Sequence, residues 1–347
     1  MIETICIVNS QVPFARGGAE MLVDSLAAEL GRRGFVVDTV ALPFHWPERV
    51  DLLKSALAWR LVDLTAAGGR KIDRVIATRF PSYAVQHPNK VVWLVHQLRQ
   101  VYDLQGSRYS DFADERPRDR RTIEMVRQID RRTLGEARAI FTISQNVAER
   151  LRRGNGLAAE VLYPPPPRDG AFHPGAFGDY VFAVGRLDRL KRFELLVRAL
   201  AHTETPVRCR IAGTGPEERA LGDLAERLGV AGRVELLGWV EDAAVVDLYA
   251  GALAVFYAPF DEDYGYVTVE AFRAGKPVVT AADSGGVLEF VEDGATGFVC
   301  PPDAPREMAA RLDLLFRDRE RARALGTAGA ARVAGIGWDR VIAALTG

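Results

Sequence analysis

Cysteine is scarce in this chain, and the few cysteines are not spaced like a functional site. The 347 residues contain three, Cys6, Cys209 and Cys300, and each lies in or beside an apolar, strand-like run. An odd number of cysteines without metal-ligand spacing argues against a disulfide framework and against a zinc site. We therefore expect three buried thiols.

Long apolar runs are also missing. No stretch approaches the roughly 18 consecutive apolar residues that a membrane-spanning helix needs. The N-terminal segment from Ile2 to Val8 has the pattern of a strand, and it lacks the basic start and the cleavage site of a signal peptide. We therefore expect a cytoplasmic protein.

Neither sign of charge dominates the chain, whose formal net charge is -1. Residues 1–165 hold 24 Lys and Arg against 19 Asp and Glu, and the remainder holds 21 against 27. Much of the basic excess lies between Arg116 and Arg132, where acidic residues are interleaved. Such a segment is usually a solvated helix face. The alternative is a surface attracted to anionic lipid headgroups at the inner face of a membrane, or to a phosphorylated acceptor. We expect no nucleic acid partner.

The first half of the chain alternates strand-like and helix-like segments, which is the pattern of a doubly wound parallel sheet. The expected strands are 4–8, 36–42, 74–77, 91–95, 139–144 and 161–163, and the expected helices are 18–33, 50–67 and 116–137. Four prolines, Pro164 to Pro167, then interrupt the pattern, because proline lacks the N–H that a sheet needs. A domain boundary is expected there, so the first domain is 1–167.

The alternation restarts after the prolines and predicts a second α/β domain over 168–333. Its expected strands are 180–184, 207–212, 234–237, 252–258, 277–280 and 297–299, and its expected helices are 193–202, 217–228, 243–250, 267–275, 306–317 and 319–333. A last amphipathic piece, 334–347, follows. Ligands of doubly wound sheets bind at the carboxyl ends of the strands. The predicted active site is thus a cleft between two facing Rossmann-like domains.

Glycines follow several of the expected strands. Gly17 and Gly18 come after the first strand and open a helix, where the backbone can approach a bound group beneath the positive end of the helix dipole. The full G-x-G-x-x-G dinucleotide fingerprint is absent, and two such glycines are equally typical of a tight turn. In the second half, Gly213, Gly215 and Gly238 follow strands and can contact a base and ribose, or can form ordinary turns.

The second domain opens with a cationic loop. Arg186 and Lys191 lie five residues apart after the strand 180–184, so both can be directed at one anionic group above the strand ends. A diphosphate leaving group needs such a clamp because its charge grows as the bond to it breaks. Surface ion pairing is the alternative for any Arg and Lys, and we assign it to the neighbouring Arg189 and Arg192.

Two glutamates bracket the turn from the strand 252–258 to the next helix. Glu262 lies in the turn, Gly265 opens the helix, and Glu270 lies inside it. The N–H groups of Tyr266 and Val267 can hold a phosphate at the helix start, while both carboxylates can accept hydrogen bonds from hydroxyl groups. A ligand with hydroxyl groups at both ends and phosphate between them is a nucleotide sugar. The alternative is a helix-favouring Glu270 and a solvated Glu262.

Together these features resemble the retaining nucleotide-sugar glycosyltransferases of family 4, whose architecture is called GT-B. The motifs that carry the resemblance are Gly17-Gly18-Ala19-Glu20, His96 after the strand 91–95, Gly185-Arg186 with Lys191, Gly213-Thr214-Gly215, Gly238, Glu262-x7-Glu270, and Ser284-Gly285-Gly286 with Glu289. They run over nearly the whole chain.

The resemblance implies a role for each of these residues. Arg186 and Lys191 would bind the diphosphate, Glu270 the ribose and Glu262 the donor sugar, while His96 would meet that sugar from the first domain. The 334–347 helix would pack back on the first domain. No cofactor is expected, because a UDP- or GDP-linked sugar is the substrate.

Two positions depart from the family pattern. Many members have glycine after the donor-site lysine, where this chain has Arg192, and Gly-Phe or Ser-Phe after the first glutamate, where it has Asp263-Tyr264. We expect the first change to be tolerated. The second lies at the edge of the donor pocket, so we expect it to influence which sugar is used.

The same segment also matches a metal-binding signature. Asp261-Glu262-Asp263 has the D-x-D form with which another glycosyltransferase architecture holds a divalent metal. This triplet is common by chance, and Arg186 and Lys191 already supply positive charge for the diphosphate. We therefore predict no metal site.

We hypothesise retaining transfer of a hexosyl group to an acceptor hydroxyl, by front-face attack in which the departing phosphate oxygen takes the acceptor's proton. The acceptor is expected on the first domain, beside the aromatic and basic segment from Gln97 to Phe112, and is a glycan or lipid-linked molecule of lipopolysaccharide or capsule assembly. The alternatives are a sugar-nucleotide epimerase, a non-catalytic nucleotide-sugar-binding protein and a dinucleotide oxidoreductase. The last of these lacks its glycine fingerprint.

Overall fold

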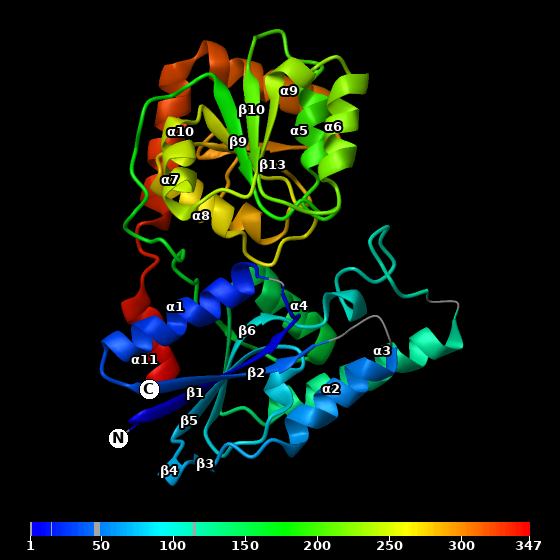
Figure 1. Ribbon diagram of the computed structural model, residues 1–347, viewed down its shortest axis with the longest axis vertical. Coiled ribbons are helices and arrows are strands. Elements are labelled where there is room, and N and C mark those ends of the chain that lie inside the picture. Colours follow the sequence, from blue (N-terminus) through cyan, green and yellow to red (C-terminus); the bar gives the residue numbers. More distant parts are fainter. Residues whose placement is uncertain (1, 15, 45–48, 114–115) are drawn as a thin grey trace. The chain divides into compact units, whose positions relative to one another are not determined.

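The chain forms two compact α/β units in a computed structural model that describes residues 2–14, 16–44, 49–113 and 116–347 (Figure 1). Unit 1 consists of Met1–Pro167 together with Gly337–Gly347, and unit 2 of Arg168–Ile336. Each unit contains one six-stranded sheet in which every pair of neighbouring strands is parallel. The predicted fold class of two doubly wound, Rossmann-like sheets is confirmed.

The sheet of unit 1 has the strand order β2-β1-β5-β6-β7-β8. Its strands are β1 (Thr4–Gln11), β2 (Val36–Pro43), β5 (Arg74–Arg79), β6 (Lys90–His96), β7 (Ala139–Thr142) and β8 (Glu160–Val161). The inner strands β1, β5 and β6 are buried along nearly their whole length, because helices cover both faces of a parallel sheet. That coverage explains why these strands appear in the sequence as continuous apolar runs.

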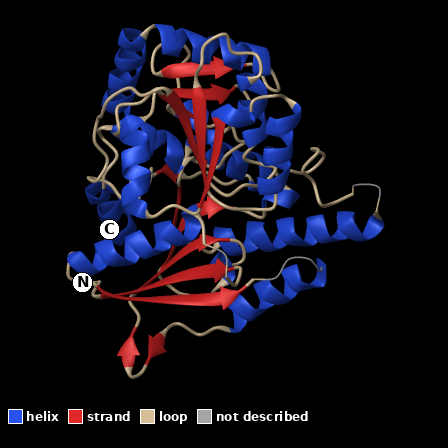
Figure 2. Ribbon diagram, turned by 45° about the horizontal axis from the view of Figure 1, so that its top comes forward, coloured by secondary structure: helices blue, strands red, loops and turns tan. Residues whose placement is uncertain are grey.

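The helices of unit 1 lie on both faces of its sheet (Figures 1 and 2). They are α1 (Gly18–Arg32), α2 (Arg49–Leu61), α3 (Pro117–Gly135), α4 (Gln145–Asn155) and α11 (Trp338–Thr346), with the short 3-10 turns η1 (Ser82–Ala84) and η2 (Arg99–Val101). Helix α11 contacts α1, and α2 contacts α3. The Trp338 ring meets Trp93 of β6 edge-on at 6.3 Å between centroids, and Leu345 is fully buried.

Two segments of unit 1 differ from the sequence prediction. The helix expected over 50–67 ends at Leu61, and Ala66–Ala67 (β3) instead pairs antiparallel with Arg70–Lys71 (β4) across Gly68 and Gly69. Both glycines have positive φ, which a tight two-residue hairpin requires. Helix α4 was not predicted, although Ser144 accepts a hydrogen bond from Val147 as its N-cap and Gly156 ends it in the left-handed region.

The sheet of unit 2 has the strand order β11-β10-β9-β12-β13-β14. Its strands are β9 (Tyr180–Val184), β10 (Arg208–Ala212), β11 (Val234–Gly238), β12 (Ala254–Phe256), β13 (Val278–Ala281) and β14 (Gly297–Cys300). Its helices are α5 (Phe193–Leu200), α6 (Glu218–Arg227), α7 (Asp242–Gly251), α8 (Tyr266–Arg273), α9 (Pro305–Arg317) and α10 (Arg319–Val333), with the 3-10 turns η3 (Ala231–Arg233) and η4 (Gly286–Glu289). All three predicted thiols are buried and unbonded to one another.

The strand order decides which loops can meet. In unit 2 the chain runs outward from β9 to β11, and then returns to the other side of β9 with β12, so the order reverses beside β9. The loops that follow β9, β10, β12 and β13 therefore gather at one edge of the sheet, where doubly wound folds bind ligands. None of the helices in the described ranges is long and apolar enough to cross a membrane.

Candidate functional site

The carboxyl edge of the unit 2 sheet brings Lys191 and Glu262 together, although they are 71 positions apart in the chain. The Lys191 Nζ atom lies 2.5 Å from Glu262 Oε2 and 3.2 Å from the Tyr257 hydroxyl oxygen. The exposed fractions of the lysine and glutamate side chains are 21% and 16%. A partly buried ion pair thus lies at the edge where an anionic ligand would bind.

Tyr257 packs against this ion pair. It directly follows β12 and is buried, and the Lys191 ammonium lies 5.5 Å from its ring centroid. Burial, with the negative charge of Glu262 nearby, raises the pKa of Tyr257 well above its ordinary value. Its hydroxyl therefore stays protonated. Tyr257 was not predicted to be part of the site.

Arg186 lies on the same loop as Lys191 but in a more solvated position. Its side chain is 67% exposed, and its Nε atom donates to Asp188 Oδ2 at 2.7 Å. Asp188 Oδ1 also accepts from the backbone N–H groups of Leu190 and Lys191. Asp188 thus shapes the loop that carries both predicted cations.

Glu270 is a buried carboxylate on α8. It is 4% exposed, accepts a hydrogen bond from the Tyr249 hydroxyl at 2.8 Å, and lies 3.8 Å from the Arg168 guanidinium. Burial raises the pKa of Glu270, while Arg168 and the Tyr249 hydroxyl act in the opposite direction. Arg168 and Tyr249 were not predicted to be near Glu270.

Helix α8 begins directly after Gly265, as predicted. Gly265 has φ +87°, and a Cβ atom there would lie 2.9 Å from the Tyr257 ring, so only glycine fits. Tyr266 and Val267 lie in the first turn of the helix, where backbone N–H groups have no intrahelical acceptor. The geometry therefore leaves a helix start of the kind that binds phosphate.

The glycines after β9 and β10 serve a close contact between two loops. A Cβ atom on Gly213 would lie 1.9 Å from the Gly185 carbonyl oxygen, and one on Gly215 would lie 2.3 Å from the Leu187 carbonyl oxygen. Gly213 also donates to the Gly238 carbonyl oxygen at 2.7 Å. Close packing between these loops explains why Gly213 and Gly215 are glycines.

The prediction for Arg192 was wrong. We assigned it to surface ion pairing, but it is 0% exposed. Its guanidinium binds the carboxylate of Asp283 and two backbone carbonyl groups inside unit 2. Arg189 does lie exposed on the same loop.

The segment with the D-x-D pattern is tied to its surroundings within unit 2. Glu262 contacts Lys191, Asp263 is buried, and Asp261 has a positive φ of 42°. Across the described ranges, no group of three or more His, Cys, Asp or Glu side chains is arranged to hold a metal ion.

In unit 1, Gly17 and Gly18 form the start of α1. The carboxylate of Glu20 accepts a hydrogen bond from the Gly17 N–H at 2.9 Å, and Glu20 is also paired with Arg79. This bond occupies the N–H group of the N-cap residue Gly17. Ala15, part of the motif before these glycines, lies outside the described residues.

His96 is the last residue of β6, and one ring nitrogen lies 2.7 Å from the Gln97 carbonyl oxygen. The segment that follows is anchored within unit 1. Tyr102 donates to buried Asp130 at 2.7 Å, and Arg99 pairs with Asp103 at 2.6 Å. The Gln97 to Phe112 segment is thus a structured part of unit 1.

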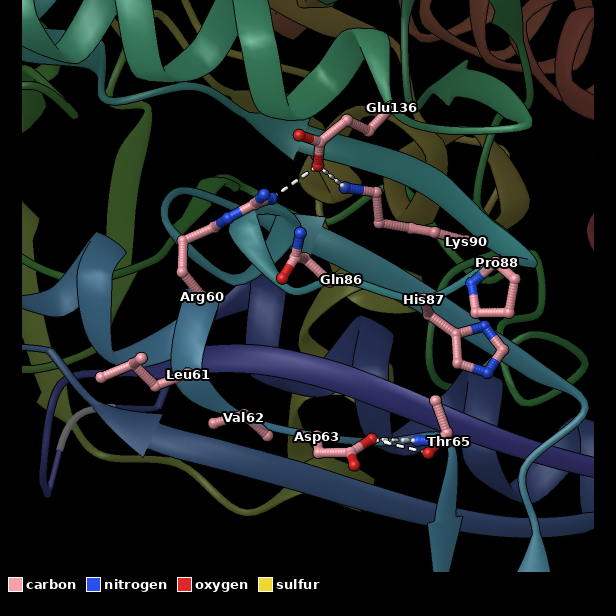
Figure 3. Close-up of a pocket in the computed structure, with 10 residues that line it drawn as sticks. All are labelled: Arg60, Leu61, Val62, Asp63, Thr65, Gln86, His87, Pro88, Lys90 and Glu136. Carbon is pink, nitrogen blue, oxygen red and sulfur yellow. Dashed lines mark hydrogen bonds and ion pairs between the residues drawn. The ribbon is translucent and has the colours of Figure 1, made fainter.

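A pocket of about 600 Å³ opens on unit 1 around the first residue of β6 (Figure 3). Lys90 is buried there and donates from Nζ to the carbonyl groups of Tyr83, Val85 and Thr133, and desolvation lowers its pKa to about 8. Glu136 lies 3.6 Å from it. The pocket is at the end of β6 opposite His96, so it is separate from the predicted site residues of this unit.

Part of the chain matches a described family. Residues 178–332, nearly all of unit 2, match the sequence model of the family "Glycosyl transferases group 1". A D-inositol 3-phosphate glycosyltransferase of Nocardia farcinica (strain IFM 10152) is 36% identical over 166 residues, which cover 45% of this chain and 36% of the relative. The same-named protein of Thermobispora bispora is 27% identical over 272 residues, covering 73% of this chain and 63% of the relative. The matches thus leave a large part of each relative uncovered.

Several solved structures share the fold. Alr3699/HepE of Anabaena, solved in complex with UDP and glucose, has a TM-score of 0.74 at 19% identity and covers 99% of both chains. The sucrose-phosphate synthase of Thermosynechococcus elongatus has a TM-score of 0.79 at 21% identity, covering 99% of this chain and 97% of that one. WaaG, a glycosyltransferase involved in lipopolysaccharide biosynthesis, has a TM-score of 0.72 at 16% identity and covers 99% and 100%. At these identities the likeness shows the fold.

Proposed function

We propose that the protein is a retaining, metal-independent glycosyltransferase that moves a hexosyl group from a UDP- or GDP-linked sugar to an acceptor hydroxyl. The observation that carries the proposal is the contact between Lys191 and Glu262 at the carboxyl edge of the unit 2 sheet. It unites a cation for a diphosphate with a carboxylate for sugar hydroxyl groups. The contact lies within the region that matches the group 1 glycosyltransferases.

The donor lies along the loops of unit 2. Arg186 and Lys191 bind the diphosphate, together with the N–H groups of Tyr266 and Val267 at the start of α8. Glu270 accepts hydrogen bonds from the ribose, and Glu262 from the donor sugar. The base lies near the glycines at Gly213, Gly215 and Gly238.

The pairing of Lys191 with Glu262 suits an enzyme that must separate charge. An ammonium group has three N–H donors, so Lys191 can keep its bond to Glu262 while it donates to a phosphate oxygen. Breaking the glycosidic bond produces an oxocarbenium-like sugar and an anionic diphosphate. Lys191 then stabilises the leaving group, and Glu262 stays beside the cationic sugar.

Retention follows if the acceptor attacks the face from which the diphosphate departs. The bond from the sugar to the phosphate oxygen breaks, the acceptor oxygen forms the new bond, and the phosphate oxygen takes the acceptor's proton. His96 positions the sugar and the acceptor from the first domain. This sequence requires no protein nucleophile.

The acceptor binds to the first domain, 1–167, against which the 334–347 helix packs, and the donor to 168–333. The acceptor is a glycan or a lipid-linked molecule of lipopolysaccharide or capsule assembly. It binds beside the Gln97 to Phe112 segment, at the inner face of the cytoplasmic membrane. The function of WaaG supports this proposal. The inositol phosphate named for the relatives also favours a phosphorylated acceptor.

The proposal is tested by measuring thermal stability with a panel of UDP- and GDP-sugars and the free nucleotides, since a ligand of the folded state raises the melting temperature. We expect one base and one sugar to stabilise the protein. Lys191→Ala and Glu262→Ala should abolish donor turnover in the folded protein, whereas Arg189→Ala, on the same loop but exposed, should not. Failure of every nucleotide and nucleotide sugar to bind would overturn the proposal. Conversion of the donor to an isomer without acceptor would indicate an epimerase.

A further inference from the structure

Arg192 is a buried cation that joins three loops of unit 2. Its Nε atom donates to the Ala258 carbonyl oxygen at 2.7 Å, and one Nη2 bond reaches the Pro259 carbonyl oxygen at 3.0 Å. The two Nη atoms also bind the two carboxylate oxygens of Asp283, at 2.8 and 2.6 Å. Arg192 follows β9, Ala258 and Pro259 follow β12, and Asp283 follows β13. One side chain thus ties together the ends of three neighbouring strands.

The backbone of Arg192 adopts a conformation that is unfavourable for arginine. Its φ and ψ are +52° and 40°, in the left-handed region where glycine is favoured and L residues are strained. Glycine would remove that strain but would also remove the guanidinium group. Because a guanidinium presents planar, paired donors, the bidentate bond to Asp283 and the two carbonyl bonds can offset the strain.

The loops joined by Arg192 are the ones that hold Glu262. Just before Glu262, the Phe260 N–H donates to the Leu190 carbonyl oxygen and the Asp261 N–H to the Asp283 carbonyl oxygen, both at 2.8 Å. Glu262 itself pairs through its backbone with the segment after Asp283, since the Gly286 N–H donates to the Glu262 carbonyl oxygen at 2.7 Å. The position of Glu262 relative to Lys191 therefore depends on how the loops after β12 and β13 sit against the loop after β9.

We infer that Arg192 is a positioning residue for the donor sugar: through Asp283 it fixes the distance between Glu262 and Lys191. This inference rests on the proposed function. Because Arg192 is fully buried, it acts through Glu262 and not by contact with the donor. It does not hold Glu270 or the start of α8, which the nucleotide would use.

The division between sugar and nucleotide makes the inference testable. A merely structural Arg192 would weaken binding of nucleotide and nucleotide sugar alike, or only lower the melting temperature. A positioning Arg192 acts on the sugar end of the donor, because Glu262 moves while Glu270, Tyr266 and Val267 stay in place. The diagnostic quantity is the ratio of the dissociation constants of a nucleotide sugar and its nucleoside diphosphate.

The test uses Arg192→Gly in the full chain, because glycine suits the left-handed backbone and leaves Lys191 in place. Binding of UDP and UDP-glucose, and of GDP and GDP-mannose, is measured by calorimetry. For the pair that the wild type binds, we expect the nucleoside diphosphate affinity to change by less than about threefold and the nucleotide-sugar affinity to fall about tenfold or more, as for loss of a hydrogen bond to a charged group. Arg189→Gly, on the same loop, is the control and should leave the ratio unchanged.

Asp283→Asn provides a second variant that keeps Arg192 and its carbonyl bonds but weakens the bidentate pair. It should change the ratio in the same direction by a smaller factor, and it decides the question if Arg192→Gly fails to fold. Equal losses for nucleotide and nucleotide sugar in these variants, or an unchanged ratio, would overturn the inference and leave the proposed function standing. A wild-type protein that binds neither pair would overturn both.

Discussion

The stability of unit 1 should depend on pH through one buried carboxyl group, Asp130 of α3. Asp130 is fully buried and accepts hydrogen bonds from the hydroxyl groups of Tyr83 and Tyr102, both at 2.7 Å. Burial raises its pKa to about 7, although both hydroxyl bonds act in the opposite direction. The change we propose is Asp130→Asn, which keeps an acceptor oxygen of similar shape and removes the titration.

The sign and size of the effect follow from this shift. The pKa of Asp130 is higher in the folded chain than in the unfolded chain, so its contribution to stability is fully present below about pH 4 and is lost as the pH rises to about 7. Within that window the folded state holds one more proton than the unfolded state. The free energy of unfolding should therefore fall by about 1.4 kcal/mol per pH unit through Asp130 alone.

The assay is urea denaturation at pH 5, 6 and 7, followed by tryptophan fluorescence. Trp59 and Trp93 are buried in unit 1 and Trp338 lies edge-on to Trp93, whereas Trp239 of unit 2 is 74% exposed. We expect the difference in unfolding free energy between wild type and Asp130→Asn to change by about 2 to 3 kcal/mol from pH 5 to pH 7. Buried Lys90 does not interfere, because its lowered pKa of about 8 makes its contribution change at higher pH.

Asp119 supplies a matched control on the same helix. It is also buried, but hydrogen bonds from the Ala113 N–H and Arg49 lower its pKa against the effect of burial. Asp119→Asn should therefore destabilise unit 1 by the same amount at pH 5 and at pH 7. Parallel pH profiles for wild type and Asp130→Asn would refute the reasoning, because they would mean that Asp130 is ionised throughout this range.

Three further predictions concern a loop glycine, the buried carboxylate of α8 and the terminal helix. Gly213→Ala should destabilise unit 2 by more than about 3 kcal/mol in thermal denaturation, since its Cβ would meet the Gly185 carbonyl oxygen. The control Gly229→Ala, also at positive φ but in open space, should destabilise it by about 1 to 2 kcal/mol. Equal effects of the two substitutions would contradict this prediction. Glu270→Gln keeps the bond from Tyr249 but removes the charge, so calorimetry should show a loss of about tenfold or more in affinity for the nucleoside diphosphate; an unchanged affinity would exclude Glu270 from the ribose site. Leu345→Ala should lower the unfolding free energy of unit 1 by about 2 to 4 kcal/mol in the fluorescence assay, because Leu345 is fully buried. Leu61 is exposed, so a smaller change for Leu345→Ala than for Leu61→Ala would refute the docking of α11.

The fold was largely predictable because the strands carry their own signal. Strands such as Tyr180–Val184 are buried on both faces in a parallel sheet, so they stand out as short apolar runs between amphipathic helices. The errors occurred where that signal is weak. Helix α4 has six charged or amide residues in its first nine and was missed. Helix α2 ends at Leu61, and part of the helix expected to run to residue 67 instead forms the first strand of the β3–β4 hairpin.

The site was predictable residue by residue, but not as a set of contacts. Lys191 and Glu262 were named separately, and no sequence spacing reveals that two residues 71 positions apart form an ion pair. Tyr257, Tyr249 and Arg168 were missed for the same reason, since each is identified only by what it touches in space. Arginine is rarely buried, and nothing in the sequence marks Arg192 as one of the buried arginines.

The loop glycines and Arg192 together explain how a charged site can be held on irregular backbone. Gly213 and Gly215 let the loops after β9 and β10 touch backbone to backbone, and Gly286 does the same for the loop after β13, where a Cβ atom would lie 2.6 Å from the Asp263 carbonyl oxygen. The loops after β9 and β12 meet near Glu262 through the bond from the Phe260 N–H to the Leu190 carbonyl oxygen, and also through the hydrogen bonds of the Arg192 side chain. Close packing by glycine tolerates little movement, whereas a contact made by one side chain can be altered by one substitution. We therefore expect substitution of Arg192 to change the distance between Lys191 and Glu262 without disturbing the helix start that would bind the nucleotide.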